Sequence, residues 1–528
     1  MKTKLFLGAF ALMLFVISCN QDGSNNKFEV QDLTMSVVAT DSATSPAPPP
    51  QDYNTEEYGN IIENDFLAAK ENPLSTFSID VDHAAYSNIR RFIREGSLPP
   101  NGAVRIEEMV NYFDYDYAPP KNDDPFAVYT EMSSCPWNEK HRLVHIGLKG
   151  KEILKDKLPA ANLVFLIDVS GSMDQPNKLP LVKSSLNMLT DQLREQDKVA
   201  IVVYAGAAGL VLPSTHGNEK TKIKDAINNL GVGGSTAGAE GIRLAYEIAR
   251  KNFIADGNNR VILATDGDFN VGVSSDDELV SLVEKEKKSN IFLTVLGYGM
   301  GNYKDSKMQQ LADKGNGNHA YIDTESEAQK ELVKEFGSNL FTIAKDVKLQ
   351  IEFNPTKVQS YRLIGYENRM LKKEDFNNDA KDAGELGAGH CVTALYEVIP
   401  VGVVDEFITK VEALKYQAQL TNNSNNATDE IMTIKLRYKK PDEEISKLIV
   451  QPVVDMHTSL KSTSDNFRFS AAVAAFGMVL RNSAYRSNAS YKSVIELAEP
   501  AKGADKEGYR SEFIELVNEA ARLTKKDE

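Results

Sequence analysis

A buried-strand pattern that ends in an aspartate constrains the fold of this chain more than any other feature. The apolar run from Asn162 to Ile167 has the length of a strand, Asp168 closes it, and Ser170 and Ser172 follow at alternate positions. Near-continuous valine, leucine and isoleucine are typical of a parallel strand covered on both faces. In open sheets of such strands, ligands bind beyond the carboxyl ends. The pattern therefore predicts a ligand site at the end of this strand.

The side chains at this strand end carry oxygen atoms suited to a hard cation. Mg2+ takes oxygen ligands and gives up its waters reluctantly. One carboxylate and two neutral hydroxyls supply oxygens without cancelling the charge of the ion. Such a site retains an affinity for one more anionic ligand from outside the protein. The alternative is that the two serines only cap a helix and the aspartate only ends a strand.

Two later segments offer further oxygen ligands. The small-residue loop from Gly233 to Gly238 can bring the hydroxyl of Thr236 close to an ion, and the apolar run from Val261 ends in Asp266. Together the three motifs resemble the metal-ion-dependent adhesion site of von Willebrand factor A domains. In that family the serines and the threonine usually touch the ion, and the aspartates often act through water. The resemblance implies a site for Mg2+ or Mn2+ formed by Asp168, Ser170, Ser172, Thr236 and Asp266.

The central segment alternates strand-like and helix-like stretches, which indicates a doubly wound, mostly parallel sheet flanked by helices. Strands are expected at Leu163–Ile167, Val199–Tyr204, Val261–Ala264 and Ile291–Leu296. Helices are expected at Lys178–Arg194, Thr221–Leu230, Ala237–Asn252, Asp276–Glu286, Lys304–Asp313 and Glu325–Phe336.

Alternating apolar and polar residues on either side of this domain predict antiparallel strands. One such region lies before the domain, at Ala127–Leu148. We expect the regions before and after it to pair, so that the α/β domain is inserted in or adjoins an antiparallel β-sandwich. Later strands are expected at Val347–Phe353, Thr393–Ile399, Leu414–Leu420 and Met432–Tyr438.

Short helical stretches are expected at both ends of the folded part. A strand at Thr76–Asp82 and helices at Ala84–Glu95 and Arg105–Phe113 predict a small N-terminal α+β segment. The apolar and alanine-rich spacing near the C-terminus predicts a helical part. Its helices are expected at Phe467–Leu480, Tyr491–Leu497 and Tyr509–Leu523.

The N-terminus has the pattern of a secretory signal. Two lysines precede an apolar stretch, from Leu5 to Ile17, that is shorter than the roughly 20 residues needed to span a bilayer. The stretch Val16 to Cys19 resembles a bacterial lipobox, which implies cleavage before Cys19 and lipidation of its thiol; the alternative is a plain signal with an incidental cysteine. The polar, proline-containing residues that follow indicate a disordered tether.

Segments outside the α/β domain resemble a group of bacterial lipoproteins that contain a von Willebrand A domain. The matching words are Ser75-Thr-Phe-Ser-Ile-Asp-Val-Asp82, Arg105-Ile-Glu-Glu-Met-Val-Asn-Tyr-Phe113, Cys135-Pro-Trp-Asn138, Gly387-Ala-Gly-His390 and Ala394-Leu-Tyr-Glu397. The expected parts are a signal peptide (1–18), the tether (19–60), the N-terminal segment (61–120), a β segment (121–160), the A domain (161–339), the β-sandwich domain (340–460) and the helical region (461–528).

Composition and missing motifs exclude several functions. The chain has 75 acidic against 60 basic residues, which argues against nucleic acid and an anionic membrane surface as its main partner. It contains no phosphate loop and no nucleophile elbow, so neither nucleotide binding nor a catalytic residue is predicted. The histidines are scattered, and no cluster of zinc ligands accompanies them. Cys135 and Cys391 could form a disulfide in an oxidising compartment, or both could be free buried thiols.

These features predict a lipid-anchored protein of the bacterial cell envelope that binds proteins and is not an enzyme. An exposed Asp or Glu of a protein partner would complete the coordination of the metal ion. One alternative is a hydrolase that uses ion-bound water, although no positioned base is evident. Another is an envelope scaffold in which the ion only stiffens the domain. A helper of a cytoplasmic ATPase fits the lipobox poorly.

Overall fold

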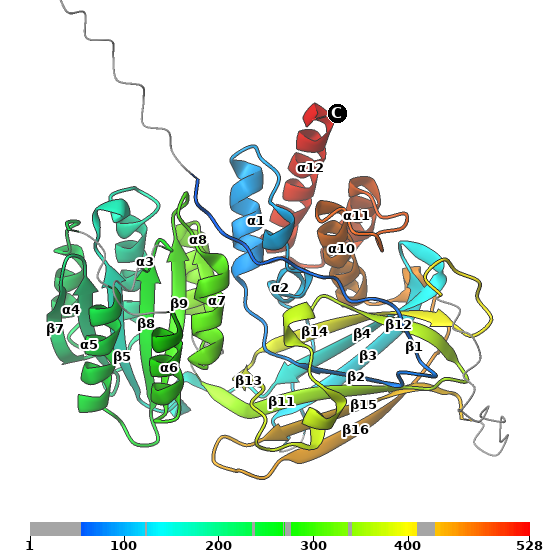
Figure 1. Ribbon diagram of the computed structural model, residues 1–528, viewed down its shortest axis with the longest axis horizontal. Helices are drawn as coiled ribbons and strands as arrows, with labels where there is room; N and C mark the ends of the chain where they lie inside the picture. The colour runs from blue at the N-terminus through cyan, green and yellow to red at the C-terminus, as the bar shows by residue number, and fades with distance from the viewer. Residues whose placement is uncertain are drawn as a thin grey trace, which may run out of the picture. The chain divides into compact units, whose positions relative to one another are not determined.

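The computed structural model describes residues 54–121, 124–234, 238–267, 269, 276–335, 341–408 and 428–527. These residues form two kinds of layered unit, an α/β sheet with helices on its faces and a pair of antiparallel sheets (Figure 1). Within this part of the chain, no helix combines the length and the apolar character needed to cross a membrane.

The α/β unit contains a six-stranded sheet with the order β10-β9-β8-β5-β6-β7. All neighbours pair in parallel except β7, which runs antiparallel to β6 at the edge. The fold class predicted from the sequence is therefore confirmed, although the sequence analysis missed β7 and β10. The strands are β5 (Ala161–Asp168), β6 (Lys198–Tyr204), β7 (Ala208–His216), β8 (Asn258–Thr265), β9 (Ile291–Tyr298) and β10 (His319–Ile322).

Helices cover both faces of this sheet because alternate residues of its buried strands point in opposite directions. The helices are α3 (Leu179–Gln192), α4 (Lys220–Asn228), α5 (Gly238–Lys251), α6 (Asp276–Lys287), α7 (Asp305–Lys314) and α8 (Glu325–Gln329), with a π-helix at Lys330–Lys334 that continues α8. On one face of β5, Leu163, Phe165 and Ile167 pack against α3, α4 and α8. On the other face, Val164 and Leu166 pack against α5, α6 and α7.

Two antiparallel sheets form the second unit and share one apolar core. One sheet has the order β1-β12-β14-β4-β3, and the other has the order β13-β11-β15-β16, with β2 paired to β11. The first sheet contains β1 (Leu67–Ala68), β3 (Phe126–Cys135), β4 (Asn138–Gly150), β12 (Val358–Ile364) and β14 (Cys391–Pro400). The second contains β2 (Leu74–Ser78), β11 (Thr342–Phe353), β13 (Gly384–Gly387), β15 (Glu430–Lys439) and β16 (Lys447–Val454).

The two β regions that flank the α/β unit pair with each other, as the sequence analysis predicted. Strand β4 precedes the α/β unit and β14 follows it, and they pair over eight residues from Arg142 to Lys149 (Figure 1). The α/β unit is therefore inserted in the β-sandwich. The strand expected at Leu414–Leu420 lies outside the described residues.

The disulfide between Cys135 and Cys391 does not form, and both cysteines are free. The register of the sheet gives the reason. Cys391 lies opposite Lys149 of β4, whereas Cys135 pairs near the other end of the same strand, with Asn138. Eleven residues of strand between these partners correspond to roughly 36 Å, well beyond bonding distance.

A helical layer packs against the β-sandwich around a separate apolar core, and its helix α1 (Ala84–Arg94) also contacts β10 of the α/β unit (Figure 1). It combines N-terminal and C-terminal helices; the helices themselves were expected from the sequence, but their packing into one layer was not. They are α1, α2 (Ile106–Asn111), α10 (Asp465–Leu480), α11 (Tyr491–Ala498) and α12 (Tyr509–Asp527). Short 3-10 turns lie at Asn101–Ala103, Lys155–Lys157, Gly171–Met173, Glu367–Arg369, Lys373–Asn377, Leu460–Ser462 and Glu499–Ala501.

Arg90 of α1 joins these parts through a buried ion-pair network. Its guanidinium, 3% exposed, donates to Asp323 at 2.8 Å, to Glu327 at 2.7 Å and to Glu512 at 2.8 Å. The first two acids belong to the α/β unit and the third to α12. Tyr112 accepts a further bond from Arg90 and donates one to Glu327. One side chain thus links three separate segments of the chain.

Replacing Arg90 should destabilise the protein far more than replacing its neighbour Arg94. Arg90→Met leaves several buried carboxylates without their cation, a change that typically costs about 3–5 kcal/mol. Arg94→Met is the matched control, because Arg94 is 45% exposed and forms its ion pair with Glu512 at the surface, so its loss should cost less than about 1 kcal/mol. Urea denaturation of both purified variants measures the difference, and equal losses would contradict the assignment.

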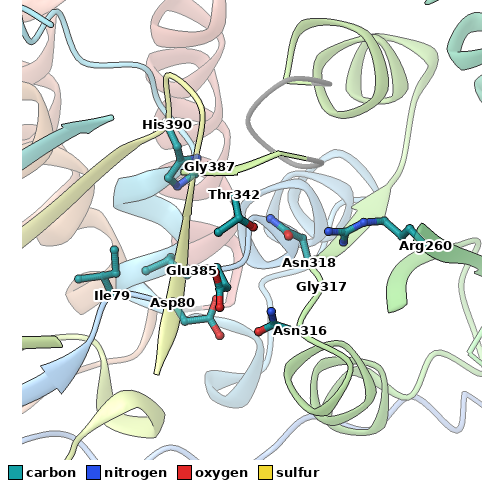
Figure 2. Close-up of a pocket in the computed structure, with 11 residues that line it drawn as sticks. Ile79, Asp80, Arg260, Asn316, Gly317, Asn318, Thr342, Glu385, Gly387 and His390 are labelled. Carbon is teal, nitrogen blue, oxygen red and sulfur yellow. The ribbon is translucent and has the colours of Figure 1, made fainter. Parts of the chain in front are cut away.

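A small polar cavity of about 40 Å³ lies where β8 of the α/β unit faces β13 of the sandwich. Figure 2 shows Arg260, Asn316 and Glu385 around it. Burial raises the pKa of Glu385 to about 8, with help from Asp346 and Asp382 and against a hydrogen bond with Asn316. Burial also lowers the pKa of Arg260 to about 10, against the attraction of Glu385.

The raised pKa of Glu385 predicts a pH-dependent stability. The folded state holds this proton up to about pH 8, whereas the unfolded chain releases it near its ordinary value. The contribution of this proton to the stability of the folded state is therefore fully present below about pH 4.5 and is lost as the pH rises towards 8. Glu385→Gln should stabilise the protein at pH 9 and lose this advantage at pH 5, by about 1.4 kcal/mol per unit of pKa difference before a discount for partial exposure. Thermal melts at both pH values test this, and a constant offset would contradict it.

Candidate functional site

The carboxylate of Asp168 is buried and fixed at the end of β5. Its Oδ1 accepts the backbone N–H of Ser170 at 2.9 Å, and its Oδ2 accepts the hydroxyls of Tyr204 at 3.0 Å and Thr265 at 3.3 Å. The two hydroxyl donors, Tyr204 and Thr265, come from β6 and β8, the strands that flank β5. Burial raises the pKa of Asp168 to about 6, partly offset by bonds from Ser170 and increased by Asp266. The strand end thus presents an oriented carboxylate.

The two serines place their hydroxyl oxygens beside each other. Ser170 Oγ and Ser172 Oγ are 3.0 Å apart. Ser170 precedes the 3-10 turn at Gly171–Met173, but its side chain makes no capping hydrogen bond there. The alternative in which Ser170 serves as a helix cap therefore lacks its characteristic contact. The hydroxyl of Ser170 instead contacts that of Ser172, and the backbone N–H of Ser170 contacts Asp168.

The loop that leads to Thr236 passes directly beside this turn. Gly233 donates its N–H to the carbonyl of Val169 at 2.8 Å, and Gly171 donates to the carbonyl of Gly234 at 3.2 Å. Gly234 has a φ of +82°, and a Cβ there would lie 2.8 Å from the backbone of Gly206, so the close approach requires glycine. Thr236 itself lies outside the described residues, and its role stays a prediction.

Asp266, at the end of β8, forms an ion pair that the sequence analysis did not predict. Its Oδ2 accepts from Lys178 Nζ at 2.9 Å, and both side chains are buried. Tyr204, Thr265 and Lys178 were all missed. Tyr204 and Thr265 were detectable from the sequence, because each is the last residue of a strand next to β5. Ligands of parallel sheets bind at these carboxyl ends. A lysine before a helix gives no such signal, since most lysines are solvated.

The oxygen atoms at this strand end fit a divalent cation. In octahedral coordination at 2.0–2.1 Å, adjacent ligand oxygens are roughly 2.8–3.0 Å apart, which matches the spacing of the two serine hydroxyls. Asp168 supplies a carboxylate held in place by other donors, an arrangement typical of residues around metal sites. The donor set is all oxygen, which suits Mg2+ or Mn2+ rather than softer metals.

A second group of metal-ligand type occurs in the described residues, at His83, Glu331 and Glu335. His83 Nδ1 lies 3.1 Å from Glu331 and 3.4 Å from Glu335. The ammonium of Lys330 already contacts both carboxylates. Burial alone would lower the pKa of His83, but Glu335 and Glu331 raise it. Positive charge from the protein itself thus balances the acids, and this group is a poorer cation site.

Other residues considered in the sequence fall elsewhere. His141 pairs with Glu397 at 2.6 Å and His145 with the hydroxyl of Tyr117 at 2.6 Å, so each is a hydrogen-bonded core group. Cys19 lies outside the described residues, and its lipidation stays a prediction.

Comparisons with known proteins match almost the whole described chain. A model of the von Willebrand factor type A domain matches residues 162–335, a von Willebrand factor model matches 52–145, and a model described as the C-terminal part of uncharacterized protein YfbK matches 338–523. YfbK of Escherichia coli K12 is 44% identical over 477 residues, which cover 89% of this chain and 82% of that protein.

Further similarities are at lower identity. Protein sll0103 of Synechocystis is 29% identical over 188 residues, 35% of this chain and 43% of that protein. A solved structure of a von Willebrand factor type A protein from Catenulispora acidiphila is 15% identical, covers 74% of this chain and 89% of its own, and has a TM-score of 0.40.

Proposed function

Because the chain belongs to the family of bacterial von Willebrand factor type A proteins that includes YfbK, we propose that it binds a protein partner through a divalent cation. The observation that carries this proposal is the pair of hydroxyls of Ser170 and Ser172, 3.0 Å apart, beside the buried carboxylate of Asp168. The ion would supply a Lewis-acidic centre that accepts a carboxylate from outside.

Each residue of the site has a distinct part in this proposal. Ser170, Ser172 and Thr236 would hold Mg2+ or Mn2+ by their hydroxyls. Asp168 would orient bound water and the Ser170 backbone, since its own oxygens accept from Ser170, Tyr204 and Thr265. Asp266 would act as a second outer carboxylate. With neutral hydroxyls in direct contact, the ion keeps its charge for an Asp or Glu of the partner.

The proposed location is the bacterial cell envelope, with the protein held to a membrane by lipid on Cys19. The apolar stretch before Cys19 and the polar, proline-containing segment after it support this location. A tether of this kind would set the metal site away from the bilayer and leave it open to a protein partner. Among the described residues, we identify no positioned general base beside Asp168, which favours binding over catalysis.

Removal of one serine hydroxyl should weaken metal binding. Ser170→Ala deletes an oxygen ligand, and we expect the dissociation constant for Mg2+ or Mn2+ to rise by about 10–100-fold or more, the range known for changes around metal sites. Ser184→Ala is the matched control, because its hydroxyl bonds to Glu325 on the same domain, away from the site. Isothermal titration calorimetry measures both, and equal affinities for the two variants would refute the site.

Partner capture should depend on the same ion. Crosslinking of the tagged full chain in intact cells, with and without a chelator, should yield captured proteins only when the metal is present. Ser170→Ala should lose capture without any chelator, and Ser184→Ala should retain it. Capture that survives both chelation and Ser170→Ala would instead favour an ion that only stiffens the domain. Metal-dependent turnover of ester, phosphate or peptide substrates would favour the hydrolase.

A further inference from the structure

A lysine is built into the metal site at a position where its charge is costly. Lys178 is 3% exposed and lies immediately before α3, the helix that follows the two serines. Burying an ammonium is unfavourable unless a partner compensates for the lost water. The start of a helix is the positive end of its dipole, so a cation is disfavoured there as well. Local helix stability therefore does not explain this lysine.

The structure directs the ammonium to the metal site rather than to solvent. Lys178 Nζ donates to Asp266 Oδ2 at 2.9 Å. Its aliphatic stem crosses the backbone of Gly299, where a Cβ would lie 2.4 Å from Cε and 2.5 Å from Cγ of the lysine. Gly299 has a φ of +70°, a conformation that glycine adopts without strain. A path without side chains at the end of β9 thus admits the lysine.

We infer that Lys178 is a positioning residue that sets the charge of the metal site, an inference that rests on the proposed function. The ammonium holds Asp266 as an outer carboxylate and offsets its charge. A divalent ion then faces the unopposed charge of Asp168 alone and keeps one net positive charge. That charge is what attracts a foreign carboxylate. The charge of Lys178 therefore lowers the affinity of the site for the ion and raises the affinity of the bound ion for the acidic ligand.

This account predicts an effect of opposite sign to simple structural damage. Lys178→Met keeps the length and apolar stem of the side chain but removes its charge. Loss of the ammonium makes the net charge at the site more negative by one unit, so the variant should bind Mg2+ or Mn2+ more tightly than the wild type does, by about tenfold. A damaged site would bind the metal more weakly. Lys178→Arg restores the charge and should return the metal affinity towards the wild-type value.

The external ligand should respond in the reverse direction. Acetate serves as the probe, because its binding to protein-bound Mn2+ displaces water and lowers the water-proton relaxivity. The Lys178→Met protein should need several-fold more acetate than the wild type for the same change, whereas Lys178→Arg should behave as the wild type does. Without metal, Lys178→Met should melt at a lower temperature than the wild type, and Mg2+ should remove most of that difference.

The experiment uses the full chain and separates the two hypotheses. Absence of Mg2+ and Mn2+ binding by the wild type would refute the proposed function. Metal binding by the wild type with equal or weaker binding by Lys178→Met would refute the role of Lys178 alone. If Lys178→Met fails to fold, Lys178→Gln removes the same charge but keeps a polar end. The inference requires that this variant, too, binds Mg2+ or Mn2+ more tightly than the wild type does.

Discussion

The pairing of β4 with β14 is the contact on which the arrangement of the other parts depends. This pairing joins strands from either side of the inserted α/β unit in one sheet of the sandwich, because β4 precedes that unit in the sequence and β14 follows it. Both ends of the α/β unit are thereby held near the same sandwich. The helical layer then covers the junction, and Arg90 fastens it by contacting acids from the α/β unit and from α12.

Local patterns in the sequence predicted the parts of the fold whose burial is uniform. Strands β5 and β8 are buried at every residue, and both were recognised as apolar runs closed by an aspartate. Strand β7 was missed because it is an edge strand with a half-exposed pattern, and β10 was missed because it is only four residues long. The helix expected at Glu325–Phe336 instead continues from α8 as a π-helix, which spacing at 3.6 residues per turn does not distinguish.

Contacts between distant segments were the least predictable. The placement of Asp168, Ser170 and Ser172 followed from their spacing within a single turn. Lys178 was invisible to the same reasoning, because its partner Asp266 is 88 residues away and its stem depends on space at Gly299. For the same reason, the sequence could not decide whether Cys135 and Cys391 form a disulfide. Only the register shows that Cys135 of β3 and Cys391 of β14 lie beside opposite ends of β4.

Two clusters of acidic groups in this protein differ in how their charge is compensated, and this difference separates a closed ion-pair network from the proposed metal site. At His83, two glutamates face the ammonium of Lys330 and a histidine whose pKa is raised, so internal cations suffice. At the end of β5, the ammonium of Lys178 pairs with Asp266, whereas the neutral hydroxyls of Ser170 and Ser172 lie beside Asp168. In the proposed function, a second protein cation at this site would take the place of the metal ion, and a further carboxylate would neutralise the ion once bound. Partial compensation by Lys178 would leave the site with an affinity both for a divalent cation and, through that ion, for an acidic side chain.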